Sequence, residues 1–274
     1  LFFILFLVRI KSIPVIAWVD NVNPHEKFPL QSFLNSIFFS LCDIFVVMSK
    51  SVKLNLLKYR TCKNKVVEIL PHPVYNVFGP PISKDLAKKN LSIDVSERCI
   101  LFFGMVRKYK GLDILLNAMS DNKIKGLNLK LIIAGEFYDS KDKYLRKISD
   151  LDLHNHIIIN DSYIENKDVV NYFCASDLVV QPYLSATQSG VSMVAYNFNK
   201  PMLLTNVGGL SDYIKDQKHG YLVNPDAQSV ASALLDFYQK NREKSFVSEI
   251  KLSKSMYTWD NFSQTIDELY KSYV

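Results

Sequence analysis

From about residue 98 onward, short apolar runs alternate with segments whose apolar residues recur every three or four positions. The runs predict strands buried on both faces, and the spaced segments predict amphipathic helices. We expect strands at 99–104, 129–135, 156–161, 178–183, 201–209 and 220–223, with helices at 111–121, 141–153, 166–177, 190–199, 210–216 and 226–241. Buried strands alternating with helices indicate a parallel sheet covered on both sides, which is a doubly wound, Rossmann-like domain. Ligands of such domains bind at the carboxyl ends of the strands.

The first third of the chain has a similar pattern that starts partway through. Buried strands are expected at 14–20, 44–49 and 65–74, with a helical stretch at 30–42. These elements fit the last strands of a second Rossmann-like domain, which is incomplete here. The segment 71–83 contains four prolines and one glycine, a composition typical of a linker. We therefore predict an N-terminal domain at 1–82 and a C-terminal domain at 83–274, the latter ending in an amphipathic helix.

The chain opens with "LFFILFLVRIK", an apolar run too short to span a bilayer, which takes about 20 residues. It has neither the basic start nor the cleavage site of a signal peptide. We interpret it as the interior of a helix, and the chain as part of a longer protein. Four separated cysteines without a Cys-x-x-Cys pair indicate reduced thiols, and residues that are 48% hydrophobic and 22% charged indicate a folded chain.

Positive charge is concentrated at one end of the chain. Residues 1–90 carry 12 Lys and Arg against 5 Asp and Glu, whereas residues 91–274 carry 21 against 22. The segment 50–65 contains six basic residues and no acidic one. Two interpretations stay open for it: a solvated helix face, or a patch that meets an anionic membrane surface or acceptor. Nucleic acid is not an expected partner, because neither interleaved aromatic residues nor a nucleic-acid-binding motif accompanies these cations.

Five segments in this order resemble the donor-binding domain of a family 4 type glycosyltransferase with the two-domain B-type fold. They are "LFFGMVRKYKGLD", "LIIAGEFYDSKDKY", "ASDLVVQPY", "SATQSGV" and "NKPMLLTNVGGLSDYIKDQKHGYLV". The segments "DNVNPHE" and "PHPVYNVFG" resemble the end of the N-terminal domain and the linker of that family. The resemblance implies two Rossmann-like domains, a nucleotide-diphosphate sugar as donor substrate and a glycan or lipid-linked acceptor. It also implies retention of configuration and a location in the cytoplasm, at the inner face of the cell membrane.

Glycosyl transfer requires that the departing diphosphate be stabilised, by a metal ion or by fixed cations and backbone N–H groups. No convincing Asp-x-Asp pair lies in a strand-end loop, so we expect neither a metal nor a cofactor. Arg107 and Lys110 follow a strand in a glycine-bounded loop, and both side chains suit phosphate oxygens. The "SATQSGV" segment follows another strand and opens a helix, whose free N–H groups attract anions. Its candidate phosphate-binding residues are Thr187, Gln188, Ser189 and Gly190.

Other candidates follow from strand ends and from the resemblance. Gly104, Gly135 and Glu136 stand where two strands end, beside the expected donor. Tyr163 and Ile164 belong to the loop that, by resemblance, holds the nucleotide base. On the acceptor side the polar candidates in the expected interdomain cleft are Asp20, Asn21, His25 and Glu26.

The chain departs from the family at its usual pair of glutamates, which have seven residues between them. The aligned positions hold Ala186 and Val194, and a shifted loop offers Gln188 and Tyr196 instead. Two other hypotheses stay open beside transfer. One is a module that binds a nucleotide sugar without turnover. The other is an epimerase of the same architecture, which the lack of cleft carboxylates disfavours.

Overall fold

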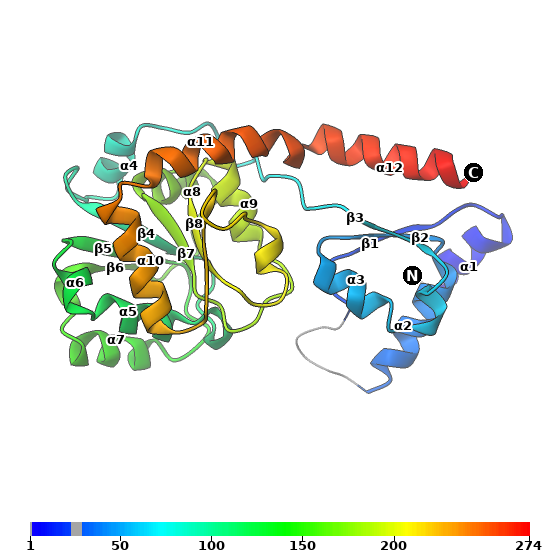
Figure 1. Ribbon diagram of the computed structural model, residues 1–274. Coiled ribbons are helices and arrows are strands. Elements are labelled where there is room, and N and C mark those ends of the chain that lie inside the picture. Colours follow the sequence, from blue (N-terminus) through cyan, green and yellow to red (C-terminus); the bar gives the residue numbers. More distant parts are fainter. Residues whose placement is uncertain (1, 23–28) are drawn as a thin grey trace. The chain divides into compact units, whose positions relative to one another are not determined.

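The computed structural model describes residues 2–22 and 29–274, and it contains two compact units. The first unit comprises Leu1–Pro73 and Met256–Val274, and the second comprises Val74–Ser255. The division differs from the expected one in two respects: the boundary lies before residue 74, and the terminal helix belongs to the first unit. The fold class is as expected, since both units contain parallel α/β structure (Figure 1).

The first unit has a three-stranded parallel sheet in the order β1-β2-β3. Its elements are α1 (Phe2–Ile10), β1 (Ile16–Val19), α2 (Gln31–Leu41), β2 (Ile44–Val47), α3 (Lys50–Leu56), a 3₁₀ turn (Arg60–Cys62), β3 (Val66–Ile69) and α12 (Trp259–Tyr273). α12 joins this unit through aromatic contacts. The Trp18 ring lies 4.5 Å from the Phe262 ring, centroid to centroid, and the Tyr273 hydroxyl donates to Asp43 at 3.1 Å. These contacts place the terminal helix in the first unit, although it follows the second unit in sequence.

The second unit has a six-stranded sheet, entirely parallel, in the order β6-β5-β4-β7-β8-β9. Its strands are β4 (Arg98–Phe103), β5 (Leu129–Ala134), β6 (Ile157–Asn160), β7 (Leu178–Gln181), β8 (Met202–Thr205) and β9 (Gly220–Val223). Its α-helices are α4 (Lys84–Asn90), α5 (Leu112–Met119), α6 (Asn122–Lys125), α7 (Lys141–Asp150), α8 (Asn166–Ala175), α9 (Gly190–Asn197), α10 (Ala227–Gln239) and α11 (Glu243–Lys254). Shorter 3₁₀ turns lie at Lys108–Lys110, His154–His156, Leu210–Asp212 and Ser255–Tyr257.

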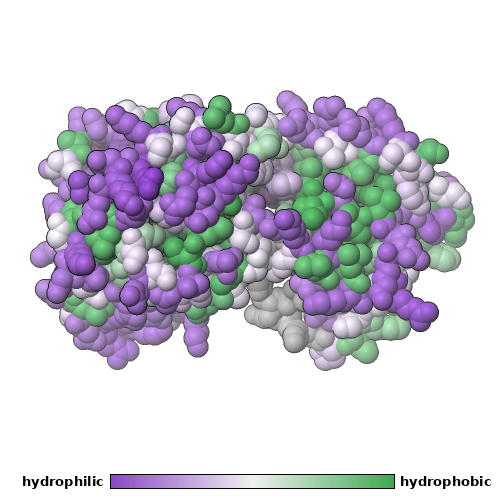
Figure 2. All heavy atoms as spheres, viewed as in Figure 1, coloured by the Kyte–Doolittle hydropathy of each residue, from purple (hydrophilic) through white to green (hydrophobic). Residues whose placement is uncertain are grey.

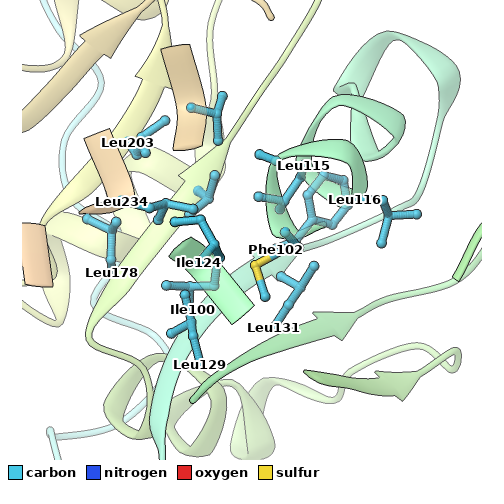
Figure 3. Close-up of a cluster of buried hydrophobic side chains, with 14 of the residues drawn as sticks. Ile100, Phe102, Leu115, Leu116, Ile124, Leu129, Leu131, Leu178, Leu203 and Leu234 are labelled. Atoms are coloured by element: carbon cyan, nitrogen blue, oxygen red, sulfur yellow. The ribbon is translucent and has the colours of Figure 1, made fainter. Parts of the chain in front are cut away.

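The core of the second unit lies between this sheet and its helices. Side chains of β4, β5 and β7 meet those of α5 and α10 in one cluster (Figure 3). Ile100, Leu115 and Leu234, from a strand and two helices, are completely buried there. Each such side chain stabilises the fold by about 1.5–3 kcal/mol relative to an exposed one. The packed core fixes the sheet, and the sheet fixes the loops at its carboxyl edge.

The helices of the first unit expose more large apolar side chains than the helices of the second unit do. Ile4, Phe6 and Ile10 of α1 are each more than half exposed. On the face seen in Figure 2, hydrophobic residues gather over the first unit, whereas hydrophilic residues dominate much of the second. None of the helices in the described residues has the length and apolar character needed to cross a bilayer.

Candidate functional site

The strand order places a topological switch point between β4 and β7. From β4 the chain proceeds outward through β5 and β6, and from β7 it proceeds to the other side through β8 and β9. Loops that leave neighbouring strands in opposite directions open a crevice at their carboxyl ends, where doubly wound domains bind ligands. The loop 104–111 leaves β4 at this point, and the loop 182–189 leaves β7.

Lys110 lies inside the β4 loop and is only 6% exposed. Its Nζ stands 3.0 Å from the point where a Cβ on Gly104 would lie, and Gly104 has a φ of 87°. Glycine at position 104 therefore satisfies a left-handed backbone and leaves room for the ammonium group. The same Nζ is 5.7 Å from the ring centroid of Tyr183, which follows β7. The lysine thus bridges the two loops of the switch point.

The ammonium group of Lys110 has no counter-charge. Among the residues that the structure describes, none forms a hydrogen bond or an ion pair with its Nζ. Burial, together with the neighbouring charge of Arg107, lowers the pKa of Lys110 from 10.5 to about 8. A buried cation without a partner is costly, and an anion placed beside it recovers that energy.

Arg107 has a different environment from Lys110 although they share a loop. Its side chain is exposed, and its guanidinium lies 4.7 Å from the ring centroid of Tyr138. Arg107 and Tyr138 line an open cavity of about 550 Å³ together with Leu184 and Ser185. The structure therefore places Arg107 at the rim and Lys110 in the interior of the same strand-end region.

Close backbone contacts fix the loops around this region. A Cβ on Gly135, which has a φ of 139°, would lie 2.5 Å from the carbonyl oxygen of Gly104, so only glycine fits. The N–H of Val106 donates to the Glu136 carbonyl at 2.8 Å, which ties the loop after β4 to the loop after β5. On the other side, the Gly209 N–H donates to the Ala186 carbonyl at 3.1 Å. Three strand-end loops and the turn before α9 therefore form one rigid edge.

The first turn of α9 offers unused donors to this edge. In the described part of the chain, no acceptor faces the backbone N–H of Gly190 or of Val191. The Val191 Cγ2 lies 3.8 Å from the Cβ position built on Gly104, the same position that the Lys110 ammonium approaches. Two sources of positive potential, a buried lysine and the first turn of a helix, therefore both lie beside Gly104.

The four predicted residues of the turn before α9 have different environments. Gly190 is exposed, Thr187 and Gln188 are half-buried, and Ser189 is buried. The Ser189 hydroxyl donates to Oε1 of Gln181, and its backbone N–H donates to the Tyr213 hydroxyl at 3.3 Å. Both of its donors are therefore used within the protein.

The remaining predicted donor-side residues lie at the ends of β5 and β6. Glu136 is half-buried, and its carboxylate has no ion pair with any residue that the structure describes. Tyr163 is 68% exposed and Ile164 is half-buried. The side chain of Asn160 organises their loop by accepting from the Ser162 hydroxyl at 2.6 Å.

The predicted acceptor-side residues belong to the first unit. Asp20 and Asn21 are exposed and follow β1 directly. His25 and Glu26 lie outside the described residues. As for metal ligands, the described residues contain no group of three or more His, Cys, Asp or Glu side chains arranged to hold an ion.

Two positions that the family comparison singled out are buried. Val194 is 5% exposed, and Tyr196 is fully buried with its hydroxyl donating to the Tyr213 carbonyl at 2.6 Å. Sequence reasoning did not identify Gln181, although a glutamine that ends the otherwise apolar strand "LVVQ" is a usable signal.

The basic segment 50–65 is partly engaged in the structure of its own unit. Lys53 donates to the Val67 carbonyl at 2.7 Å, and Lys65 donates to the carbonyls of Phe39 at 2.7 Å and Ser40 at 3.0 Å, beside the end of α2. Arg60 and Lys63 are exposed. The segment is therefore not a uniform solvated face, since part of its charge stabilises the ends of nearby elements.

The fold and this edge define a doubly wound domain with a buried lysine and the N-terminus of a helix at its switch point. A sequence profile for the family "Glycosyl transferases group 1" matches residues 97–240, which is more than half of the chain. The chain belongs to that family.

The chain is also similar to individual proteins. The chain is 28% identical over 193 residues to an uncharacterized glycosyltransferase of Methanocaldococcus jannaschii, covering 67% of this chain and 47% of the relative. It is 26% identical over 205 residues to lipopolysaccharide 1,2-N-acetylglucosaminetransferase of Salmonella typhimurium, covering 69% and 52% respectively. Among solved structures, Anabaena HepE in complex with UDP matches with a TM-score of 0.83 and 15% identity, covering 98% of this chain and 75% of HepE. The chain thus spans about half the length of the two glycosyltransferases that it matches in sequence.

Proposed function

We propose that the whole protein transfers a sugar from a nucleotide-diphosphate donor to a glycan or lipid-linked acceptor, without a metal ion and with retention of configuration. The observation that carries the proposal is the buried, unpaired ammonium of Lys110 beside the open N-terminus of α9. Both features favour an anion with oxygens on more than one side, as a diphosphate has.

In glycosyl transfer, negative charge develops on the oxygen of the departing diphosphate. When the bond between the sugar C1 and the diphosphate oxygen breaks, the electron pair goes to that oxygen. Lys110 and the N–H groups of Gly190 and Val191 stabilise the resulting charge, and Arg107 adds a bidentate contact at the rim. Because these groups are fixed by the sheet edge, little reorganisation accompanies bond breaking. Removing one such donor typically costs about 10²–10³ in kcat.

The remaining roles extend the same proposal outward from the diphosphate. Thr187 and Gln188 add neutral contacts, Tyr163 and Ile164 bind the base, and Glu136 contacts donor or acceptor. Asp20 and Asn21, with His25 and Glu26, serve the acceptor side. Retention is supported by the family resemblance. The exposed cations Arg60 and Lys63 support docking at an anionic membrane surface on the cytoplasmic side, which suits a lipid-linked acceptor.

A donor screen tests the proposal. Thermal unfolding is followed with uridine and guanosine diphosphates and their sugars, because a ligand at 100 times its Kd adds about 2.7 kcal/mol of stability. HepE, whose structures contain UDP and UDP-glucose, makes the uridine compounds the first choice. We expect one nucleotide series to stabilise the chain in the presence of EDTA. Absence of stabilisation by every nucleotide would contradict the proposal.

Turnover is tested on the full-length protein. Donor hydrolysis is compared between the natural enzyme and variants with Arg107→Ala or Lys110→Ala, and we expect a loss of about 10²-fold or more for Lys110. Unchanged turnover would remove the role given to these cations. Tight nucleotide binding without any product would instead identify a binding module.

A further inference from the structure

Gln181 is the last residue of β7 and is 1% exposed. A buried primary amide has two donors and two acceptor sites, and leaving them unpaired is costly. Each of the two polar atoms of the Gln181 amide has a local partner. Its Oε1 accepts from the Ser189 hydroxyl, and its Nε2 donates to the Ser192 hydroxyl at 3.0 Å. One buried amide therefore connects the residue before α9 with the first turn of that helix.

Ser189 occupies the N-cap position of α9, where a serine hydroxyl ordinarily accepts a hydrogen bond from the helix. Its φ of −142° and ψ of 112° are extended, as a capping residue requires, yet its hydroxyl makes no cap bond. Four other helices of this chain show the usual arrangement with an extended cap residue. In α3, α4, α10 and α12, an N–H three residues later donates at 2.7–3.3 Å to the side chain of the cap residue, which is Ser49, Ser83, Asp226 or Thr258. In α6 the Asp121 side chain also accepts from the N–H two residues later, that of Lys123, at 2.8 Å. For α9 the N–H three residues after Ser189, that of Ser192, already donates to the Ser189 carbonyl at 3.2 Å, so the N–H left for a side-chain cap is that of Val191, two residues later.

The missing cap has a direct cause and a direct consequence. The hydroxyl of Ser189 donates to Gln181 and also bonds the Tyr183 side chain, so it does not accept from the N–H of Val191. That N–H consequently stays available at the point that the buried, unpaired Lys110 also approaches. A side-chain cap would occupy the same donor that a phosphate oxygen needs, and the two acceptors would compete.

We propose that Gln181 is a positioning residue that keeps α9 uncapped, so that the first-turn N–H groups remain free for the diphosphate of the donor. This inference rests on the proposed function for the identity of the anion. Gln181 does not touch the ligand. It acts through Ser189, and the same amide anchors the first turn through Ser192.

A rescue experiment distinguishes this role from a structural one. In Gln181→Leu the Ser189 hydroxyl loses its Gln181 acceptor and keeps only the Tyr183 side chain as a partner. We expect it to turn and cap Val191, so that uridine or guanosine diphosphate binds about five- to tenfold more weakly, as an N-cap bond worth about 1 kcal/mol implies. In the double variant Gln181→Leu with Ser189→Ala no cap is available, and we expect the affinity to return toward that of the natural chain. If Gln181→Leu weakened binding only by disturbing the packing, the double variant would not regain affinity, because shortening a second side chain does not restore lost packing.

Ser192→Ala is the matched control. It removes the other hydrogen bond of the Gln181 amide but leaves Ser189 where it is, so we expect a change in affinity of about twofold or less. Gln181→Met, which is closer in shape, replaces Gln181→Leu if that variant unfolds. Calorimetry gives the affinities, and thermal unfolding verifies that each variant is folded.

Hydrogen exchange tests the same inference without a ligand. The Val191 amide should exchange more slowly in Gln181→Leu than in the natural chain, and fast exchange should return in the double variant. A double variant as weak as Gln181→Leu, or a Val191 amide unaffected by either change, overturns the inference. If the natural chain binds neither diphosphate, the proposed function fails as well, whereas normal binding without rescue overturns the role of Gln181 alone.

Discussion

The two ends of the six-stranded sheet differ in whether a buried charge has hydrogen-bond partners. At the amino end, Asp177 precedes β7 and its carboxylate is fully paired. Lys84 donates to it at 2.7 Å, the Cys99 N–H at 2.9 Å and the Tyr238 hydroxyl at 3.1 Å. At the carboxyl end, the equally buried ammonium of Lys110 has no such partner in the described residues. Since one sheet holds both, the difference shows that the fold can satisfy a buried charge and does not do so where a ligand is expected.

The largest effect should come from breaking the paired end. Asp177→Ala removes the acceptor for three donors and leaves Lys84 with Glu243 alone, at 2.6 Å. We expect a loss of about 3–5 kcal/mol in the free energy of unfolding, measured by urea denaturation. Asp177→Asn, which keeps an acceptor for the Cys99 N–H, should cost less. If the two variants lose the same amount, hydrogen bonding at this end matters less than charge.

Lys110→Met, at the carboxyl end, should raise the free energy of unfolding, whereas Asp177→Ala lowers it. Replacing an unpaired buried cation with an apolar side chain of similar length should raise the free energy of unfolding by up to ~3 kcal/mol, since its pKa lies at about 8 rather than 10.5. The same change should weaken diphosphate binding by about tenfold or more. A variant that loses stability together with affinity would contradict the contrast between the two ends.

The pH dependence of stability gives a third comparison. Below about pH 8, Lys110 is charged in the folded and the unfolded chain, so its burial penalty is complete. Between about pH 8 and pH 10.5 the unfolded chain binds more protons, so this residue's contribution to the free energy of unfolding becomes less unfavourable as pH rises. The stability difference between Lys110→Met and the natural chain should therefore shrink over that interval. A difference independent of pH would show that Lys110 is not the titrating group.

The smallest effect should come from the outer part of the paired end. Glu243 has a side chain that is 36% exposed, and its pair with Lys84 is partly screened by solvent. Glu243→Gln should lower the free energy of unfolding by less than about 1 kcal/mol and leave nucleotide affinity unchanged. A larger loss would mean that the exposed Glu243 contributes to stability as strongly as the buried part of the Asp177–Lys84 network.

Much of the fold could be predicted from the sequence, because strands buried on both faces give continuous apolar runs. Each of the expected strands of the second unit is present, and the order of elements indicated the parallel sheet. Helices α4 and α11 were not predicted, since "KDLAKKN" and "EKSFVSEIKLSK" carry many polar residues and bury few positions. The placement of the terminal helix could not be predicted either, since an amphipathic pattern shows that a face is buried but not against which sheet.

The site was predictable in outline and not in detail. Glycine-bounded loops at strand ends indicated Arg107, Lys110 and the turn before α9, and the structure places Lys110 and α9 at one point. Spacing alone does not reveal that Lys110 is interior whereas Arg107 is exposed, or that the Ser189 hydroxyl is directed away from the helix. Those distinctions depend on side-chain direction, which is set by packing between loops from distant parts of the chain.

Proton uptake on binding tests the central claim most directly, that a diphosphate binds against the buried ammonium of Lys110. Calorimetric titration of the chain with uridine or guanosine diphosphate at pH 8, in buffers of different ionisation enthalpy, measures the protons taken up. Because the pKa of Lys110 is about 8, roughly half of these residues are neutral at that pH and become charged beside an anion. The account predicts an uptake of about half a proton in the natural chain and none in Lys110→Met. Binding without uptake, or equal uptake in the variant, would contradict it.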